Sequence, residues 1–254
     1  MEIAVWISLA VFLVTSSVVG GRLLLLSSRT GQLPELLIGV GILGIGPLGL
    51  GLSMLAWLPG RSTILGVTLV GCSFLALFIG AASQYVFTWY VFHQGDRWAR
   101  PACVVAVLLL ASAYAGDILE NGLINRDRGG FWFWLGTSLR AGVLGWVATE
   151  AFVYWLRMKR RLRLGLADPV VTNRFLLWSL GSAFAFLGSS IGAGVIAATG
   201  FGSRLIPALA LVLCAHGLLA AVAMWLAFLP PPRYRRWIER RSQRSRATVS
   251  SRFP

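Results

Sequence analysis

The sequence predicts an all-α integral membrane protein, a bundle of seven transmembrane helices. Its 254 residues are 57% hydrophobic and only 13% charged, whereas soluble domains are about 45–50% apolar and about 25% charged. Seven apolar runs are long enough to cross a bilayer core, which takes about 20 helical residues. Most of the net charge of +14 lies in two segments that flank such runs. Together these observations indicate a multi-pass membrane protein.

The expected spans are separated by connections rich in turn residues and charges. The first run has an acidic rather than a basic lead and no convincing cleavage site, which favours a span over a removed signal peptide. The third run is long and must tilt or extend past the bilayer. The spans are expected at residues 3–27, 33–57, 63–92, 101–123, 131–156, 174–199 and 204–229, within one transmembrane domain over 1–232.

The distribution of basic residues predicts the orientation. Cytoplasmic connections of membrane proteins carry an excess of Lys and Arg. With the N-terminus outside and the C-terminus inside, 18 basic residues fall on the inner side and four on the outer side. This bias favours that topology, in a bacterial inner membrane. The residues expected to face anionic lipid are Arg157, Lys159, Arg160, Arg161, Arg163, Arg235, Arg236, Arg240 and Arg241.

The segment 233–254 is expected to be a basic cytoplasmic tail. Three prolines end the last apolar run, and Tyr234, Trp237 and Ile238 follow at helical spacing among arginines. That pattern predicts a short interfacial helix on the anionic inner leaflet, followed by a disordered end. A protein partner at this cytoplasmic face is the other partner that the pattern suggests. Nucleic acid is not an expected partner, because the sequence carries no recognition fold for it.

Ionisable residues within the spans are the candidate functional groups, since such residues normally face the bundle interior and pair. One group lies near the inner helix ends and another toward the outer half, where Asp117 is expected to pair with Arg140 and Glu120 to line an outward cavity. A mid-span histidine is a candidate proton or ligand group, or a neutral ring that donates to a nearby carbonyl. The candidates are Asp117, Glu120, Arg140, His216, Glu150, Glu35 and Arg22.

Glycines and a proline mark expected packing and hinge positions. The stretch "GVGILGIGPLGLG" contains Pro47, which is expected to kink the second span. The motif "GSSIG" places Gly188 and Gly192 four residues apart, as in close helix contacts, more often within one chain than between two. The three cysteines lie in or beside apolar runs, and no Cys/His spacing predicts a disulfide or a metal site.

The stretches "LPELLIGVGILGIGPLG", "FTWYVFHQGDRWARP" and "LGLADPVVTNRFLLW" resemble a recurrent set of bacterial seven-span membrane proteins. The resemblance implies the fold and an inner-membrane location, and it transfers no catalytic residue. In outline the topology also resembles microbial rhodopsins, which bind retinal through a lysine in the seventh span. The only lysine here is Lys159, outside that span, so covalent retinal is excluded and no cofactor is expected.

Three functional classes follow from this pattern. A receptor-like or sensor-like module that binds a small or lipid ligand within the bundle is the leading hypothesis. The alternative is a small proton- or ion-coupled transporter that uses the buried carboxylates, Arg140 and His216. An enzyme is not expected, because no nucleophile–base or metal constellation appears in the sequence.

Overall fold

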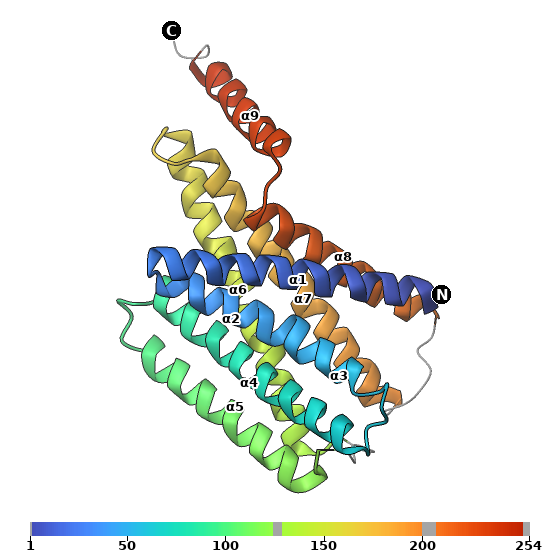
Figure 1. Cartoon of the computed structure of the whole chain (residues 1–254). Helices are drawn as coiled ribbons and strands as arrows, with labels where there is room; N and C mark the ends of the chain where they lie inside the picture. Colours follow the sequence, from blue (N-terminus) through green and yellow to red (C-terminus); the bar gives the residue numbers. More distant parts are fainter. Residues whose placement is uncertain (1, 124–128, 200–206, 251–254) are drawn as a thin grey trace.

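The computed structural model describes residues 2–123, 129–199 and 207–250 (Figure 1). Long helices dominate these residues, and the basic loop residues Arg126, Arg128 and Arg204 lie outside them. The elements are α1 (Glu2–Thr30), α2 (Leu33–Ile45), the π-helix η1 (Gly46–Gly51), α3 (Leu52–Leu55), α4 (Ile64–Phe92), α5 (Ala99–Asn121), α6 (Phe131–Arg163), α7 (Pro169–Thr199), α8 (Pro207–Phe228) and α9 (Pro232–Ser250).

Six helical segments are long and apolar enough to cross a membrane: α1, the α2–α3 segment, α4, α5, α7 and α8. The chain therefore has the character of a multi-pass membrane protein. The helix α6 is not among the six, although a seventh span was expected there. It is 33 residues long, but Arg140, Glu150 and several glycines and tryptophans lower its hydropathy.

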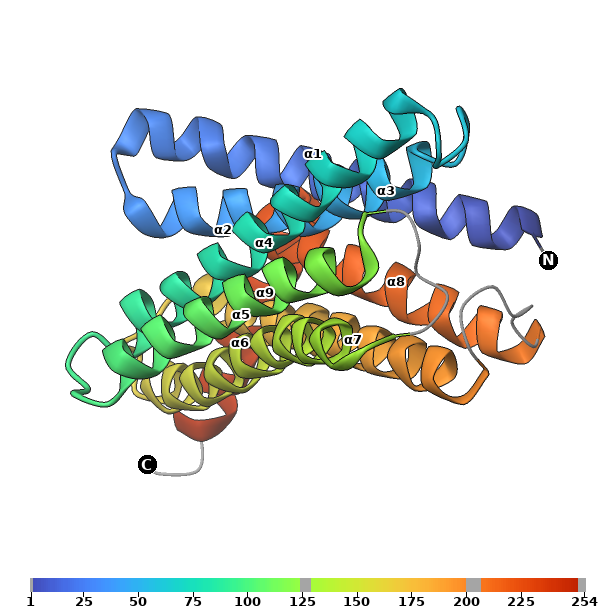
Figure 2. The same cartoon turned by 90° about the horizontal axis from the view of Figure 1, so that it is seen from below.

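The contacts between the long helices close into a ring, and Figure 2 shows these helices from below. The α1 helix packs on α2, α2 on α4, α4 on α5, α5 on α6, α6 on α7, α7 on α8, and α8 returns to α1. In addition, α4 contacts α6 across the ring. Two core clusters fill the interior, one around Val19, Phe87 and Trp178 and one around Tyr85 and Leu110. Without α6 the ring would be open between α5 and α7.

The backbones of α2 and α4 lie close together at two glycines. A Cβ atom added to Gly44 would lie 2.7 Å from the Cα of Gly80, and one added to Gly80 would lie 2.9 Å from the carbonyl carbon of Gly44. Neither position has room for a side chain, because the neighbouring atoms belong to the backbone. The expected role of glycines in close helix packing is therefore seen between α2 and α4.

The second span is distorted around Pro47, where a kink was expected. The α-helix ends at Ile45, and the π-helix η1 follows before α3 resumes α-helical geometry. Proline has no N–H to donate, and π-helical turns are a known cause of helix distortion. The hydroxyl of Ser73 on α4 donates to the Gly49 carbonyl oxygen at 2.7 Å, in a buried position. A side chain of α4 thus satisfies part of the distorted turn.

The motif "GSSIG" lies on α7. A Cβ added to Gly188 would lie 3.4 Å from the Cβ of His216 on α8, whereas one added to Gly192 would meet nothing within 4 Å in the described part of the chain. Gly188 thus lies at the α7–α8 contact within the chain.

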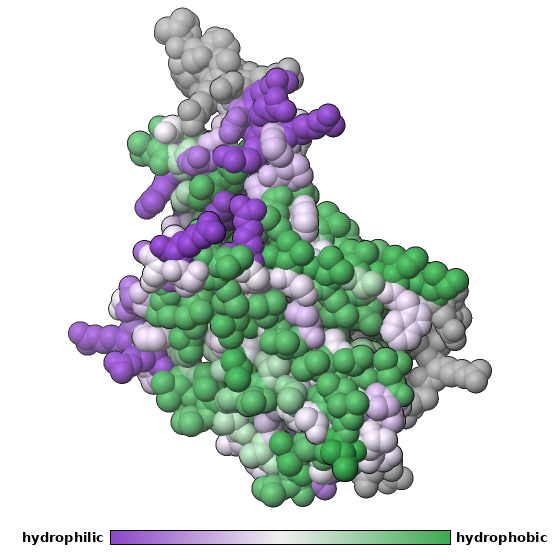
Figure 3. Space-filling model, viewed as in Figure 1, coloured by the Kyte–Doolittle hydropathy of each residue, from purple (hydrophilic) through white to green (hydrophobic). Residues whose placement is uncertain are grey.

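Hydrophilic residues gather at one end of the molecule, around α9 and the neighbouring ends of α6 and α7 (Figure 3). The α9 helix is attached to α7, because the Asn173 amide donates to the Tyr234 hydroxyl at 3.0 Å and Ile238 is buried. The helix continues to Ser250, farther than the short helix expected from the sequence, and residues 251–254 lie outside the described part. This end carries the basic residues of α6 and α9, and the start of α1 lies away from it (Figure 1).

Candidate functional site

The residues expected in the outer half have local partners. Asp117 is buried, with 5% of its surface exposed, and accepts a hydrogen bond from the Asn121 amide at 2.9 Å. Arg140 donates to the Thr137 hydroxyl at 3.2 Å, and its guanidinium carbon lies 5.9 Å from the centre of the Tyr114 ring. Within the described residues, Asp117 and Arg140 do not form the ion pair expected from their similar depths.

Glu120 lies at the surface of the molecule. A Cβ added to Gly130, the residue that caps the N-terminus of α6, would lie 2.5 Å from both carboxylate oxygens of Glu120. The carboxylate therefore sits at the positive end of the α6 dipole, which stabilises a negative charge. Neither of the two cavities described below is lined by Glu120.

His216 is bonded to its own helix. Its Nδ1 atom lies 2.7 Å from the Val212 carbonyl oxygen, and a carbonyl can only accept, so Nδ1 carries the proton. The ring contacts Phe184 of α7 edge to face, at 6.0 Å between centroids. The ring thus donates to a nearby carbonyl, which is the contact expected of a structural histidine rather than of a proton or ligand group.

Arg22 and Glu35, two of the candidates near the inner helix ends, lie outside the interior of the ring. Arg22 is exposed on α1. Glu35 accepts a hydrogen bond from the Thr30 hydroxyl at 2.6 Å, which joins the two helices at their turn. Glu150, by contrast, belongs to a larger polar network that connects α4 and α6.

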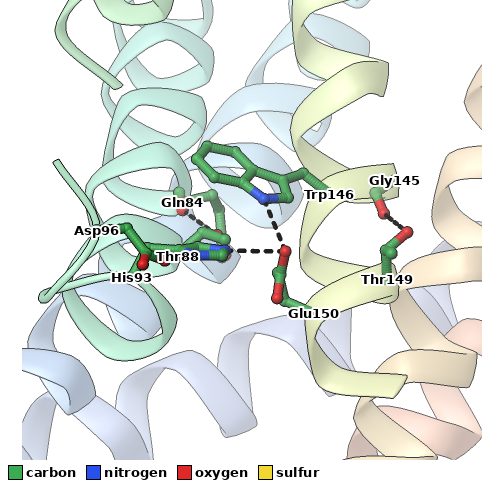
Figure 4. A network of polar contacts seen from close by, with 8 residues as sticks. All are labelled: Gln84, Thr88, His93, Asp96, Gly145, Trp146, Thr149 and Glu150. Atoms are coloured by element: carbon green, nitrogen blue, oxygen red, sulfur yellow. Dashed lines mark hydrogen bonds and ion pairs between the residues drawn. The ribbon is translucent and has the colours of Figure 1, made fainter. Parts of the chain in front are cut away.

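That network centres on His93, the residue that ends α4 (Figure 4). Its Nδ1 atom lies 2.7 Å from Asp96 Oδ2, and its Nε2 atom lies 2.9 Å from Glu150 Oε1 on α6. The second contact is an ion pair by distance, although its direction does not satisfy a hydrogen bond at Nε2. The Trp146 indole N–H donates to the same Glu150 oxygen at 3.2 Å. One imidazole thus lies between two carboxylates.

Aromatic rings enclose the imidazole. Trp146 stacks on it with 5.9 Å between ring centroids and 28° between planes, and Trp98 lies 5.1 Å away. The side chain of His93 is 13% exposed and that of Glu150 is 20% exposed. Both His93 and Glu150 are therefore mostly buried but still reached by water. Solvent and salt screen their interaction less than that of an ion pair on the surface.

The electrostatic surroundings favour the protonated form of His93. Burial acts to lower its pKa, but the contacts with Asp96 and Glu150 and their negative charges outweigh burial, and the pKa of His93 is raised above its usual value. Protonation makes His93 a cation between two anions. Because Glu150 lies on α6, a positive charge on this ring adds an electrostatic attraction between the end of α4 and α6.

A cavity of about 250 Å³ opens beside this network at the basic end of the molecule. It carries two acidic and two basic side chains, so it can hold a polar molecule by charge and its aromatic walls can pack on apolar parts. Its lining consists of Phe92, His93, Asp96, Glu150, Val153, Tyr154 and Arg157. Over the described residues, no group of three or more His, Cys, Asp or Glu side chains is arranged to hold a metal ion.

Sequence reasoning named Glu150 but did not join it to His93, Asp96 and Trp146. Two local signals were present: His93 and Asp96 are three residues apart at a helix end, and Trp146 and Glu150 are four apart on one helix face. The contact between the two pairs depends on how α4 and α6 are rotated about their axes, which depth in the membrane does not specify.

No protein-family model, curated protein or solved structure matches this chain. The resemblance to bacterial seven-span proteins therefore stays a prediction, and the functional argument rests on the geometry of the site.

Proposed function

We propose that this chain is a receptor-like or sensor-like module of the bacterial inner membrane, which binds a small polar ligand in the cavity beside His93. The observation that carries the proposal is the position of His93 between Asp96 and Glu150, at 2.7 and 2.9 Å. A ligand that competes for either carboxylate, or a change in the charge of His93, would alter the link between α4 and α6.

We propose that binding of the ligand is transmitted along α6 to the basic residues at its cytoplasmic end and on α9. Beyond Glu150, α6 continues through Arg157 to its end at Arg163, next to α7, on which α9 is docked. A shift of α6 relative to α4 would move these cations. Their proposed partners are the anionic lipids of the inner leaflet, each basic residue contributing about 1 kcal/mol near such a surface, or a cytoplasmic protein.

The proposal includes α6 as a seventh span, with the N-terminus outside and the C-terminus in the cytoplasm. Support comes from the closed ring, in which α6 packs between α5 and α7 as the other spans pack on their neighbours. The two charged residues inside the expected span have partners within the molecule: Glu150 contacts His93 and Trp146, and Arg140 contacts Thr137. Such pairing is what makes ionisable residues tolerable in a membrane span.

Cysteine labelling tests α6 directly. In intact cells, Phe131→Cys at the exposed start of α6 should react with a membrane-impermeant maleimide, because it faces the outside. Leu166→Cys, in the exposed turn after α6, should react only after permeabilisation. Labelling of both positions from the same side would show that α6 does not cross the membrane.

A proton- or ion-coupled transporter is the second candidate, favoured by the acid–histidine pair at an inner helix end. Transport and sensing differ in a reconstituted flux assay. In liposomes loaded with a pH-sensitive dye, the sensor proposal predicts that wild-type protein gives no more proton flux than Glu150→Gln protein under an imposed potential. Flux that depends on Glu150 would instead favour the transporter.

A further inference from the structure

A second cavity, of about 270 Å³, lies at the other end of the ring from His93. It is a groove between the first half of α1 and the end of the second span. Every lining residue is apolar, including Trp6, Leu9 and Leu13 on α1 and Gly51, Leu55 and Leu58 on the opposite side. No charged or polar side chain lines it, so it offers nothing to a polar ligand.

The groove opens on the surface that faces lipid. Trp6 is 62% exposed and Leu58 is 82% exposed, and both border segments are long and apolar enough to lie in a bilayer. Any molecule in the groove is therefore taken from the membrane rather than from water.

The floor of the groove is formed at Gly51, the last residue of η1. A Cβ added there would lie 3.6 Å from Leu13 Cδ2, an ordinary van der Waals distance. A methyl group therefore fits at this point, whereas a larger side chain would extend into the groove that Gly51 lines.

We infer that one acyl chain of a membrane phospholipid occupies this groove as a resident lipid. A methylene group needs about 30 Å³, roughly the volume of a water molecule in the liquid. The groove, of about 270 Å³, therefore holds roughly nine methylene groups. Three residues after Leu58, the Arg61 guanidinium lies 4.4 Å from the centre of the Trp57 ring. A cation stacked on an interfacial tryptophan suits the phosphate of a headgroup whose chain enters the groove.

Native mass spectrometry of the detergent-purified full chain tests this inference. The Gly51→Leu variant fills the floor, and Gly51→Ala is the matched control because a methyl group fits there. We expect one phospholipid per chain to be retained by the wild type and by Gly51→Ala, and at least a fivefold lower retained fraction for Gly51→Leu. The Ala10→Leu variant, which fills the groove from α1, should show the same loss.

Three results would overturn the inference: no retained phospholipid on the wild type, equal retention by Gly51→Leu and Ala10→Leu, or a second copy of the chain in place of the lipid. Folding is controlled by the thermal unfolding midpoint of each variant. Should Gly51→Leu fail to fold, Ala10→Leu decides the question. The result is independent of the His93 site, which lies at the opposite end of the bundle.

Discussion

Replacing Gly80 by alanine is expected to push α4 away from α2 and to lower the free energy of unfolding by about 1–3 kcal/mol, the usual cost of overpacking. The new methyl group would meet the backbone of Gly44 and Ile45 at 2.9 Å. Backbone atoms cannot rotate away as a flexible side chain can. The reciprocal change, Gly44→Ala, should have a similar effect, because its methyl group would meet the backbone of Ala76 and Gly80 at 2.7 Å.

The matched control lies on the same helix. A Cβ added to Gly71 of α4 would meet only the end of the Leu123 side chain, at 3.9 Å. Gly71→Ala should therefore leave stability unchanged or raise it by up to about 1 kcal/mol through helix propensity. Unfolding midpoints in detergent compare the variants. Equal losses for Gly71→Ala and Gly80→Ala would show that the close α2–α4 contact is not formed.

Breaking the link between α4 and α6 is the second change with a large expected effect. Glu150→Gln and His93→Gln should each destabilise the protein, and the double variant should lose less than the sum, because each single change leaves a half-buried partner without its counter-charge. We expect a coupling energy of about 0.5–3 kcal/mol, the range for residues in contact within one polar network. Glu239→Gln, in the exposed part of α9, serves as the control and should be silent.

The coupling should also depend on pH. Because the pKa of His93 is raised in the folded protein, the link contributes fully below the unfolded value, about 6.5, and is lost as pH rises through the raised folded value. The double-mutant cycle should therefore give its full coupling near pH 6 and little at pH 9. A coupling that grows with pH, or none at either pH, would contradict the assignment of His93 as the cation.

Hydropathy and length were sufficient to predict where most helices lie. The third span was expected at 63–92 and α4 covers Ile64–Phe92, while the fourth was expected at 101–123 and α5 covers Ala99–Asn121. These segments are set by the requirement that a helix cross an apolar layer, which a single sequence displays directly.

The helix ends that lie outside the apolar runs were placed less well. The α7 helix begins at Pro169 rather than at 174, because Asp168 caps it: its carboxylate accepts from the backbone N–H of Val170 at 2.6 Å and of Val171 at 3.1 Å. Asp followed by Pro is a start signal that the sequence carried. A prediction based only on apolar residues does not use this signal.

The candidate site could be predicted only in part. Depth along the helices placed Glu150 near the inner end, but depth alone does not specify how a helix is rotated about its axis. The Asp117–Arg140 pair was expected from depth alone, yet Asp117 bonds with Asn121, one turn away on its own helix. The network around His93 arises from tertiary packing of α4 against α6.

The central claim is that protonated His93 holds the end of α4 against α6, and a pulsed electron paramagnetic resonance distance tests it most directly. Gly95 precedes the cavity residue Asp96, and Arg160 follows the cavity residue Arg157 by about one helical turn; both are exposed. Spin labels at Gly95→Cys and Arg160→Cys report the separation once the three native cysteines, Cys72, Cys103 and Cys214, are replaced by serine. We predict a short, narrow distance distribution at pH 6 and a longer, broader one at pH 9, with the difference abolished by Glu150→Gln. The same distribution at both pH values in the otherwise wild-type protein would contradict the account.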